Sequence, residues 1–326
     1  MAKEKRSRIR KRRGCLSGCL ARLLMLLGFL ALVFVGVHLF GFVQNDEETG
    51  EPRLTFGKEP VPLLPGDIGN GISALLSSIP SWPYGIRSEG MTLKILRGGR
   101  GQALLLCCDG YTAMIGGGSE TYSAGLQMLL CGVSRLDAAV IPSSDGKDAG
   151  GMAFVIQTGK PSYLFLTGIV TQTAEWQRME KAFPENRRII PTPGLSFNLG
   201  RGRVTFVGPG SEGYTANENR SLSLRVDYGG TSILIPGRMP KDGEQNLLSS
   251  GAVINADVLI AANGGEEGAT GESLIAAVKP RIAVCTGNLD WRVKARLQSA
   301  GAAVYTVKEH GVMTIRSDGT DVRIEP

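Results

Sequence analysis

The feature that most limits how this chain can fold is an apolar stretch near its N-terminus, residues 23–43, LLMLLGFLALVFVGVHLFGFV. It is 21 residues long, and His38 is its only ionisable group. A helix of about 20 apolar residues is long enough to cross the hydrocarbon core of a bilayer, which is roughly 30 Å thick. The stretch therefore predicts a transmembrane helix rather than part of a folded core.

The residues before this stretch are strongly basic. Residues 1–13 hold eight Lys or Arg and one Glu, and such clusters stay on the cytoplasmic side of a membrane. The expected topology is an uncleaved signal-anchor, with residues 1–22 as a cytoplasmic tail against anionic lipid and the C-terminal part outside. A cleaved signal peptide is the alternative, but its apolar core usually has about 7–15 residues and ends at a small-residue cleavage site, which is missing here.

The basic tail also accounts for the positive charge of the chain. The whole chain carries +6 and residues 1–22 carry +8, so the remainder carries −2. Overall basicity is therefore no reason to expect a nucleic-acid-binding surface on the folded part. The expected partners are the cell membrane and a protein of the cell envelope, and nucleic acid stays open only through a local patch at Arg97 and Arg100.

The cysteines after the apolar stretch do not form a metal or disulfide pattern. Cys107, Cys108, Cys131 and Cys285 are irregularly spaced, which argues against a zinc knuckle and against a disulfide scaffold. Neighbouring residues of a strand point to opposite faces, so Cys107 and Cys108 are both expected to be small core residues. Whether any of the four forms a disulfide stays open.

The pattern of the remaining chain separates a stalk from a folded domain. Residues 44–90 are rich in Pro, Gly and acids and predict a stalk, with at most one short helix around Ile72–Ser78. From Met91 on, the predicted strands are MTLKIL, QALLLCC, YTAMIGGG, LDAAVI, VTFVG, SLSLRVDYGG, TSILIPG, ADVLIAAN, RIAVCTG, AAVYTV and GVMTIRS. The predicted helices are YSAGLQMLLCGV, QNLLSSG, GESLIAAVKP and RVKARLQSAG. Two strand-rich halves that each close with helix–strand units predict one α/β domain over residues 91–326, with two facing sheets and helices outside.

The order of these elements resembles the metallo-β-lactamase fold, and most of all the soluble C-terminal domain of the ComEC family of DNA-uptake channels. The similarity covers about residues 91–322. It is found in MTLKILRGGRGQALLL, MIGGG, GVSRLDAAVIPSSDGKDAGG, NENRSLSLRVDYGGTSILIPGR, VKPRIAVCTGN and LQSAGAAVYTVKEHGVMTIRSDG. The resemblance implies an αββα sandwich of two facing mixed sheets with helices outside, preceded here by the transmembrane helix.

The same resemblance implies a metal site whose ligands differ in this chain. Members of the family bind one or two zinc or manganese ions through a His-x-His-x-Asp-His loop, a further histidine and a bridging aspartate. The four loop positions are occupied here by Ser143, Asp145, Lys147 and Asp148. The resemblance therefore places a degenerate site in this loop.

The remaining ligand positions of the family differ as well. Gly116 stands where an aspartate follows the third strand, Arg238 where the bridging aspartate lies, and Asn263 where a histidine is usual. A zinc site needs imidazole or thiolate ligands, and the chain has only two histidines, His38 and His310. Neither stands at these positions, so no metal, other cofactor or catalytic residue is expected there.

Three further interpretations concern the loop itself. Asp145 and Asp148 could hold magnesium or manganese, but Lys147 and Arg238 would repel a divalent cation. Arg238 is instead expected to pair with one of the two carboxylates and so hold the loop in shape. A serine nucleophile at Ser143 would lack a histidine partner.

The turn RGGRGQ, residues 97–102, is a second candidate binding element. Arg97, Arg100 and the backbone N–H groups of a Gly-rich turn could hold a phosphate. No Gly-Lys-Ser/Thr follows, so the turn is not a P-loop, and its glycines also suit a tight hairpin. The binding candidates are thus Arg97, Arg100, Asp145, Asp148 and Arg238.

These features predict a single-pass protein of the cytoplasmic membrane with an extracytoplasmic C-terminal domain. The expected role of that domain is non-catalytic, as a binding or scaffolding pseudoenzyme. The alternative is a metal-dependent hydrolase or nuclease related to DNA uptake that uses an unusual carboxylate site.

Overall fold

The computed structural model describes residues 89–169, 171–209 and 221–325, together with the backbone of three short strands nearer the N-terminus. The chain divides into two units, residues 1–68 and 69–326. The first unit contains an antiparallel sheet in the order β1-β2-β3, with β1 (Val43–Asn45), β2 (Pro52–Phe56) and β3 (Glu59–Pro62). These strands fall largely within the predicted stalk, where the sequence predicts no strand.

The predicted membrane span lies outside the described residues, except for Val43, with which β1 begins. The predicted stalk helix around Ile72–Ser78 also lies outside them. In the part of the chain that the structure describes, no helix is long and apolar enough to cross a bilayer.

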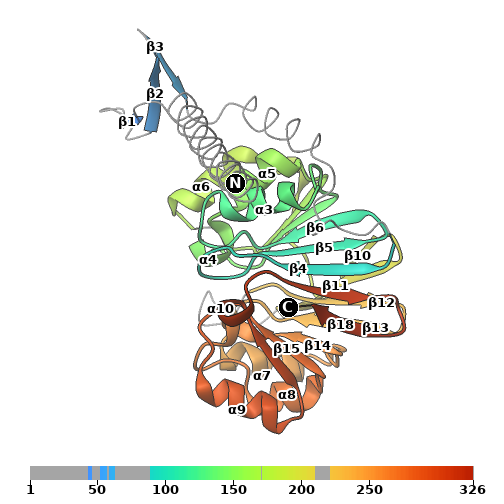
Figure 1. The fold of residues 1–326 in the computed structure, drawn as a ribbon. Coiled ribbons are helices and arrows are strands. Elements are labelled where there is room, and N and C mark those ends of the chain that lie inside the picture. Colours follow the sequence, from blue (N-terminus) through green and yellow to red (C-terminus); the bar gives the residue numbers. More distant parts are fainter. Residues whose placement is uncertain are drawn as a thin grey trace, which may run out of the picture. The chain divides into compact units, whose positions relative to one another are not determined.

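The second unit contains two mixed sheets that pack face to face (Figure 1). In the first sheet the strand order is β18-β17-β4-β5-β6-β7-β8-β9. Strands β6 to β9 run parallel, and the other neighbours are antiparallel. Its strands are β4 (Met91–Ile95), β5 (Leu104–Cys108), β6 (Tyr111–Ile115), β7 (Ala138–Ile141), β8 (Tyr163–Leu166), β9 (Arg188–Ile189), β17 (Met313–Ser317) and β18 (Val322–Glu325).

The second sheet repeats this organisation in the order β10-β11-β12-β13-β14-β15-β16. Strands β13 to β16 run parallel, and β10 to β13 are antiparallel neighbours. Its strands are β10 (Ser196–Leu199), β11 (Gly202–Gly208), β12 (Ser223–Tyr228), β13 (Thr231–Ile235), β14 (Val258–Ile260), β15 (Ile282–Cys285) and β16 (Ala303–Thr306).

Helices cover the outer face of each sheet (Figure 1). Those on the first sheet are α3 (Ser123–Leu130), α5 (Met152–Gly159) and α6 (Ala174–Ala182). Those on the second sheet are α7 (Lys241–Ser249), α8 (Glu272–Val278) and α9 (Trp291–Ser299). Short helical turns at loop positions are α4 (Gly146–Ala149), α10 (Val307–His310), η1 (Glu185–Arg187) and η3 (Ala262–Gly265).

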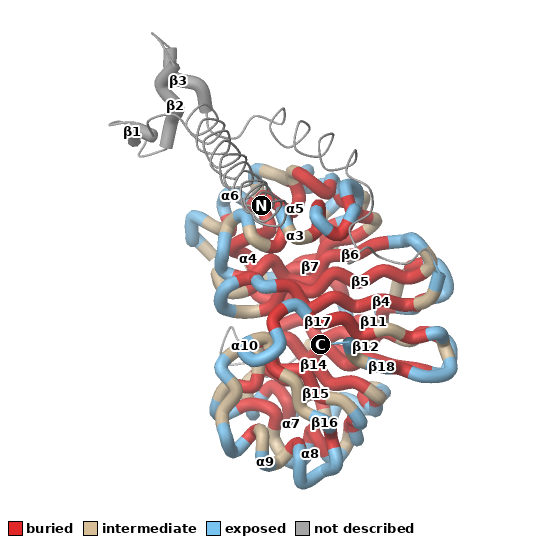
Figure 2. Tube along the Cα trace, in the orientation of Figure 1, coloured by how far each residue is buried: buried red, intermediate tan, exposed pale blue. Residues whose placement is uncertain are grey.

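The alternation of side chains along the strands divides the apolar residues into three layers. The central strands of both sheets are buried along most of their length (Figure 2). On β5, Leu104 and Leu106 belong to the layer between the sheets, whereas Leu105 packs under the helices of the first sheet. A separate layer lies under the helices of the second sheet. The folded unit is therefore the αββα sandwich that the sequence predicts.

The adjacent cysteines of β5 are both buried, as expected. Cys108 faces the layer between the sheets, and Cys107 is 1% exposed on the opposite face. Cys107, Cys108, Cys131 and Cys285 are free thiols in the structure. Burial raises the pKa of Cys108 and of Cys285 to about 12, so both stay protonated and unreactive.

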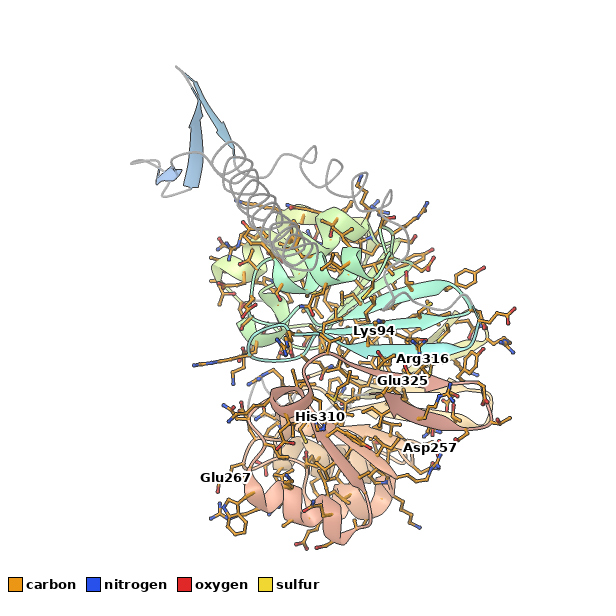
Figure 3. All side chains as sticks on the ribbon, viewed as in Figure 1. Lys94, Asp257, Glu267, His310, Arg316 and Glu325 are labelled. Atoms are coloured by element: carbon orange, nitrogen blue, oxygen red, sulfur yellow. The ribbon has the colours of Figure 1, made fainter. Side chains whose placement is uncertain are left out.

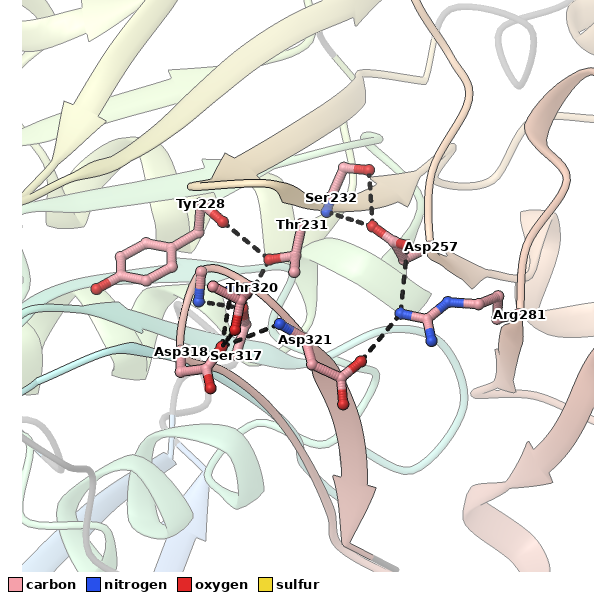
Figure 4. A network of polar contacts seen from close by, with 10 residues as sticks. Tyr228, Thr231, Ser232, Asp257, Arg281, Ser317, Asp318, Thr320 and Asp321 are labelled. Carbon is pink, nitrogen blue, oxygen red and sulfur yellow. Dashed lines mark hydrogen bonds and ion pairs between the residues drawn. The ribbon is translucent and has the colours of Figure 1, made fainter.

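Polar contacts join the two sheets at the end where the parallel strands begin. Figure 4 shows Arg281 between Asp257 and Asp321, at 3.4 and 3.2 Å, together with the contact between Thr231 and Ser317. The hydroxyl oxygens of Thr231 and Ser317 are 2.6 Å apart. This network links the β12–β13 turn of the second sheet to the β17–β18 turn of the first.

A second link at the same end involves Asp109 in the β5–β6 turn. Arg201, in the β10–β11 turn, donates two side-chain hydrogen bonds to its carboxylate, at 2.8 and 2.9 Å. The Tyr228 hydroxyl donates a third at 2.7 Å. The Arg201 guanidinium holds the pKa of Asp109 well below its usual range. Both links fix this end of the sandwich.

One buried charge lies on the outer face of the first sheet, away from the loops described below. Lys94 of β4 is 1% exposed, and burial lowers its pKa. It is labelled with Arg316 of β17 and Glu325 of β18 in Figure 3. Arg316 Nε donates to Glu325 Oε2 at 2.9 Å.

Candidate functional site

The candidate site lies at the opposite end of the sandwich, where the parallel strands end. From the first sheet come the β4–β5 turn, residues 96–103, the loop after β6, residues 116–122, and the loop after β7, residues 142–151. From the second sheet come residues 236–240 after β13 and 261–266 after β14. Ligands of open α/β sheets bind at the carboxyl ends of strands, so this edge is where chemistry is expected.

Glycines allow the loops of the first sheet to pack in backbone contact. Gly101 has a φ of +91°, and a Cβ on it would lie 1.9 Å from the carbonyl oxygen of Lys147. A Cβ on Gly118 would lie 2.2 Å from the carbonyl oxygen of Gly98. The glycines of RGGRGQ and MIGGG thus allow the backbones of these two segments to pack closely against each other and against the loop after β7.

The loop after β7 holds two carboxylates in different environments. Asp145 caps α4, and its Oδ1 accepts the Lys147 N–H at 2.7 Å. Asp148 is fully buried, and its Oδ2 accepts the Ser143 hydroxyl at 2.6 Å. Burial raises the pKa of Asp148 to about 6, although the Ser143 hydrogen bond and the charge of Arg238 act in the opposite direction.

Two ion pairs connect the loops of the two sheets across the site. Arg238, after β13, places its Nη2 3.6 Å from Asp145 Oδ2, with only 11% of its side chain exposed. Lys147 places its Nζ 3.5 Å from Glu266 Oε1, after β14. The backbone adds a further link, since Leu222 donates its N–H to the carbonyl of Pro142 at 2.8 Å. Side-chain cations therefore connect the loops of the two sheets.

Several buried polar atoms around these pairs make no hydrogen bond within the described part of the chain. They are Gln102 Nε2, Asp148 Oδ1, Arg238 Nε and Asn263 Oδ1. Asn263 is held in place by its N–H, which bonds to the carbonyl of Gly237 at 2.8 Å, and by its Nδ2, 3.5 Å from Glu266 Oε2. The site is thus polar, and its residues pack closely against one another.

The structure brings most of the predicted site residues together. Ser143, Asp145, Lys147 and Asp148 form one loop, and the expected pairing of Arg238 with a carboxylate is present as the contact to Asp145. Two other predicted positions adjoin this loop: Gly116, whose N–H bonds to the carbonyl of Val140, and Asn263. The part that these residues play in binding stays a prediction.

The predicted phosphate cradle at the β4–β5 turn is less open than expected. The N–H of Arg97 bonds to Gln127 Oε1 at 3.1 Å, and the N–H of Arg100 bonds to Ser119 Oγ at 2.9 Å. The Arg97 guanidinium lies beside Gly311. A phosphate would have to displace these bonds, which argues against the cradle.

Sequence reasoning missed two residues of the site. Glu266 pairs with Lys147, and the only signal for it was its charge in the turn AANGGEE after a predicted strand. The backbone of Gln102 lies beside Asp148 and acts to lower the pKa of its carboxyl. No sequence signal pointed to Gln102, because a backbone contact does not depend on the type of side chain.

The residues present do not fit the metal centre that the fold family implies. No group of three or more His, Cys, Asp or Glu that could hold a metal ion occurs among the described residues. The candidate donors in the loop are Asp145 and Asp148, and Arg238 already contacts the first of them. Zinc requires nitrogen or sulfur ligands in a closed geometry, so these donors do not complete a metal centre of the family's kind.

Comparison with known proteins bears on the family. No family model matches the chain. ComE operon protein 3 of Bacillus subtilis (strain 168) is 24% identical over 189 residues, which cover 57% of this chain and 24% of that protein. The chain is related to the ComEC family. Because the match spans only about a quarter of ComE operon protein 3, the activity and partners of that whole protein do not transfer to this chain.

Some solved structures resemble this chain in fold, at low sequence identity. The metallo-β-lactamase fold protein YhfI from Bacillus subtilis is 13% identical with a TM-score of 0.44, covering 66% of this chain and 95% of YhfI. CmlA, a diiron β-hydroxylase from Streptomyces venezuelae, is 10% identical with a TM-score of 0.48, covering 70% of this chain and 54% of CmlA. At these scores neither structure carries an argument about function. The strand order and the three apolar layers define the fold without them.

The buried carboxyl of Asp148 predicts a specific pH dependence of stability. Its pKa is about 6 in the folded protein against an ordinary value of 3.8, so the folded state holds the proton more tightly than the unfolded chain. The resulting stabilisation is complete below pH 4 and is lost as the pH rises through 6. A pKa shift of this size corresponds to a change of about 2–3 kcal/mol in the free energy of unfolding.

Urea unfolding of the wild type and of Asp148→Asn at pH 4 and pH 7.5 checks this. Between pH 4 and pH 7.5, the free energy of unfolding of the wild type is expected to fall by about 2–3 kcal/mol more than that of the variant. Asp242→Asn serves as the control, because Asp242 is exposed on α7 and does not contribute to the surroundings of Asp148. Equal pH profiles for the wild type and Asp148→Asn would show that Asp148 is not held as described.

Proposed function

We propose that this ComEC-related domain is a non-catalytic binding or scaffolding domain, displayed on the outer side of the cytoplasmic membrane by a single N-terminal anchor. The observation that carries the proposal is the contact between Arg238 and Asp145 at 3.6 Å. An arginine stands where the family has a metal-bridging aspartate, and it pairs with a residue of the family's ligand loop.

Electrostatics support a non-catalytic site. Arg238 brings a cationic side chain into the site, and that side chain is mostly buried. A divalent cation in the same space would be repelled by Arg238 and by Lys147, strongly so because the dielectric constant of a partly buried site is low. Arg238 and Lys147 supply the positive charge beside Asp145, Asp148 and Glu266.

The placement outside the membrane is supported by the N-terminal sequence. The basic residues 1–22 and the apolar residues 23–43 favour an anchor with its N-terminus in the cytoplasm. A partner in the cell envelope follows from that location. Fusion of alkaline phosphatase to the C-terminus tests it, since this reporter is active only outside the cytoplasm; an inactive fusion of full length would contradict the topology.

A second candidate function is a metal-dependent hydrolase or nuclease. It is favoured by one observation: Asp148 Oδ1 is buried and has no hydrogen-bond partner within the described residues, as a ligand oxygen would be. With Asp145 it would form a carboxylate centre of the kind that magnesium or manganese accepts.

A phosphodiesterase assay separates the two candidates. The full chain in detergent is incubated with bis(p-nitrophenyl) phosphate and with single-stranded DNA in manganese, magnesium or zinc. The expected result is no hydrolysis above that of an Asp145→Ala, Asp148→Ala double variant purified in parallel. Hydrolysis by the wild type that is lost in this double variant, and kept in an Asp321→Ala control at an exposed position, would support the hydrolase and refute the proposal.

A further inference from the structure

A buried glutamate of α7 binds the backbone just before α8. Glu244 is 3% exposed, and acidic side chains are seldom buried to this degree unless they are paired. Its Oε1 accepts the N–H of Thr270, and its Oε2 accepts the N–H of Gly271 at 2.8 Å. The carboxylate thus joins the two helices through two charge-assisted hydrogen bonds.

The surroundings of Glu244 are closely packed and favour its charge. A Cβ on Gly271 would lie 3.0 Å from Glu244 Oε2, so a larger residue at position 271 would press on the carboxylate. Burial raises the pKa of Glu244, although the two N–H groups act in the opposite direction. The charges of Arg296 and Lys241, which line the same hollow of about 350 Å³, also favour the ionised carboxylate.

Thr270 has a backbone conformation that its own side chain disfavours. Its φ is +54°, and it is fully buried. A β-branched residue in the left-handed region is rare, and such a conformation persists only where the surrounding structure holds it. Two hydrogen bonds hold Thr270: its N–H donates to Glu244, and its hydroxyl donates to the carbonyl of Ala262 at 3.3 Å.

Ala262 begins the turn that carries two residues of the candidate site. The turn is η3, and Asn263 within it has a φ of +48°. Glu266, which forms the ion pair with the loop after β7, follows η3 directly. The contact of Glu244 with Thr270, and that of Thr270 with Ala262, therefore lead into the site.

We propose that Glu244 is a positioning residue of the candidate site, because by holding Thr270 it fixes the turn that carries Asn263 and Glu266. The alternative is that Glu244 only stabilises the packing of α7 on α8. Positioning is favoured because Thr270 needs contacts from outside to keep its conformation, and Glu244 supplies one of them. The proposal rests on the proposed function only in treating this turn as part of the site.

Hydrogen exchange in the full chain in detergent tests the proposal. Glu244→Gln keeps the shape of the side chain but turns an NH₂ group toward one of the two backbone N–H groups. The amides of residues 263–266 are expected to exchange at least tenfold faster in this variant than in the wild type. Thr270→Val, which removes the hydroxyl bonded to Ala262, is expected to accelerate the same amides. Because both variants act on one chain of contacts, their combined effect is expected to be smaller than the product of the two.

Two controls separate positioning from a general loss of stability. Glu272→Gln makes the same chemical change at an exposed residue of the same hollow and is expected to leave the exchange of residues 263–266 unchanged. Leu247→Ala removes a side chain of α7 that is 3% exposed. It is expected to accelerate the amides of α7 without a local effect on residues 263–266.

Three results would overturn the proposal. The first is unchanged exchange of residues 263–266 in Glu244→Gln. The second is unchanged exchange of these residues in Thr270→Val, which decides the matter even if Glu244→Gln does not fold. The third is equal acceleration of these residues in Leu247→Ala and Glu244→Gln, which would show that Glu244 only stabilises α7. None of these results depends on whether the chain hydrolyses phosphodiesters, so failure here is distinct from failure of the proposed function.

Discussion

Replacing Arg238 with alanine is expected to lower the free energy of unfolding by about 2–3 kcal/mol at pH 7.5, because the buried Asp148 loses a compensating charge and the partly exposed Asp145 loses its ion pair. Arg238 contacts Asp145 at 3.6 Å, and its charge favours the ionised form of the fully buried Asp148. Without the guanidinium, Asp148 must either stay charged in a buried position without that compensating charge or take up a proton. Urea unfolding of the full chain in detergent, followed by circular dichroism, measures the loss.

Two further variants show whether this loss comes from the pair of charges. Adding Asp148→Asn to Arg238→Ala is expected to recover part of the lost stability, because the uncompensated carboxylate is removed. Arg292→Ala removes an arginine of an exposed ion pair, 54% exposed and 3.1 Å from Glu267, and is expected to cost less than about 1 kcal/mol. Equal losses for Arg238→Ala and Arg292→Ala would mean that Arg238 is an ordinary surface arginine.

Replacing Gly101 with alanine is expected to lower the free energy of unfolding by about 3 kcal/mol, because the new Cβ clashes and the backbone is strained. The new Cβ would stand 1.9 Å from the carbonyl oxygen of Lys147, and φ is +91°. A carbonyl oxygen of the backbone cannot rotate away, so the β4–β5 turn or the loop with Asp145 has to move. The same urea titration measures the effect.

Gly110 offers a matched control for this substitution. Its φ is +88°, close to that of Gly101, but nothing lies within 4 Å of a Cβ built on it. Gly110→Ala therefore carries the backbone strain alone and is expected to cost about 1–2 kcal/mol. If both variants lose the same stability, the close packing of the two loops in the site is not as described.

The fold was predictable where periodicity and burial agree. On β5 and β13 one face lies between the sheets and the other under helices, and both strands were recognised as apolar runs. Helix α9 was recognised because only Val293 and Leu297 are buried on its inner face. Helix α5 was missed, because it is buried on nearly all sides and its sequence shows no polar face.

The candidate site was predictable in its residues but not in all its contacts. The loop with Asp145 and Asp148 was found because it follows a buried strand, and the pairing with Arg238 followed from the family's ligand positions. The pairing of Lys147 with Glu266 joins residues more than a hundred positions apart, and no local pattern specifies it. The short strands β2 and β3 were missed because Pro and charged residues interrupt them, and β1 because it begins within the predicted membrane span.

The metal content of the purified full chain tests the central claim most directly. Protein prepared without added metal salts, dialysed in metal-free buffer, is analysed by inductively coupled plasma mass spectrometry, with Asp145→Ala, Asp148→Ala as reference. If Arg238 and Lys147 have taken the place of the metal, zinc, manganese and iron are each expected below about a tenth of an ion per chain, as in the reference. One or two tightly held ions per chain, lost in the double variant, would contradict the account.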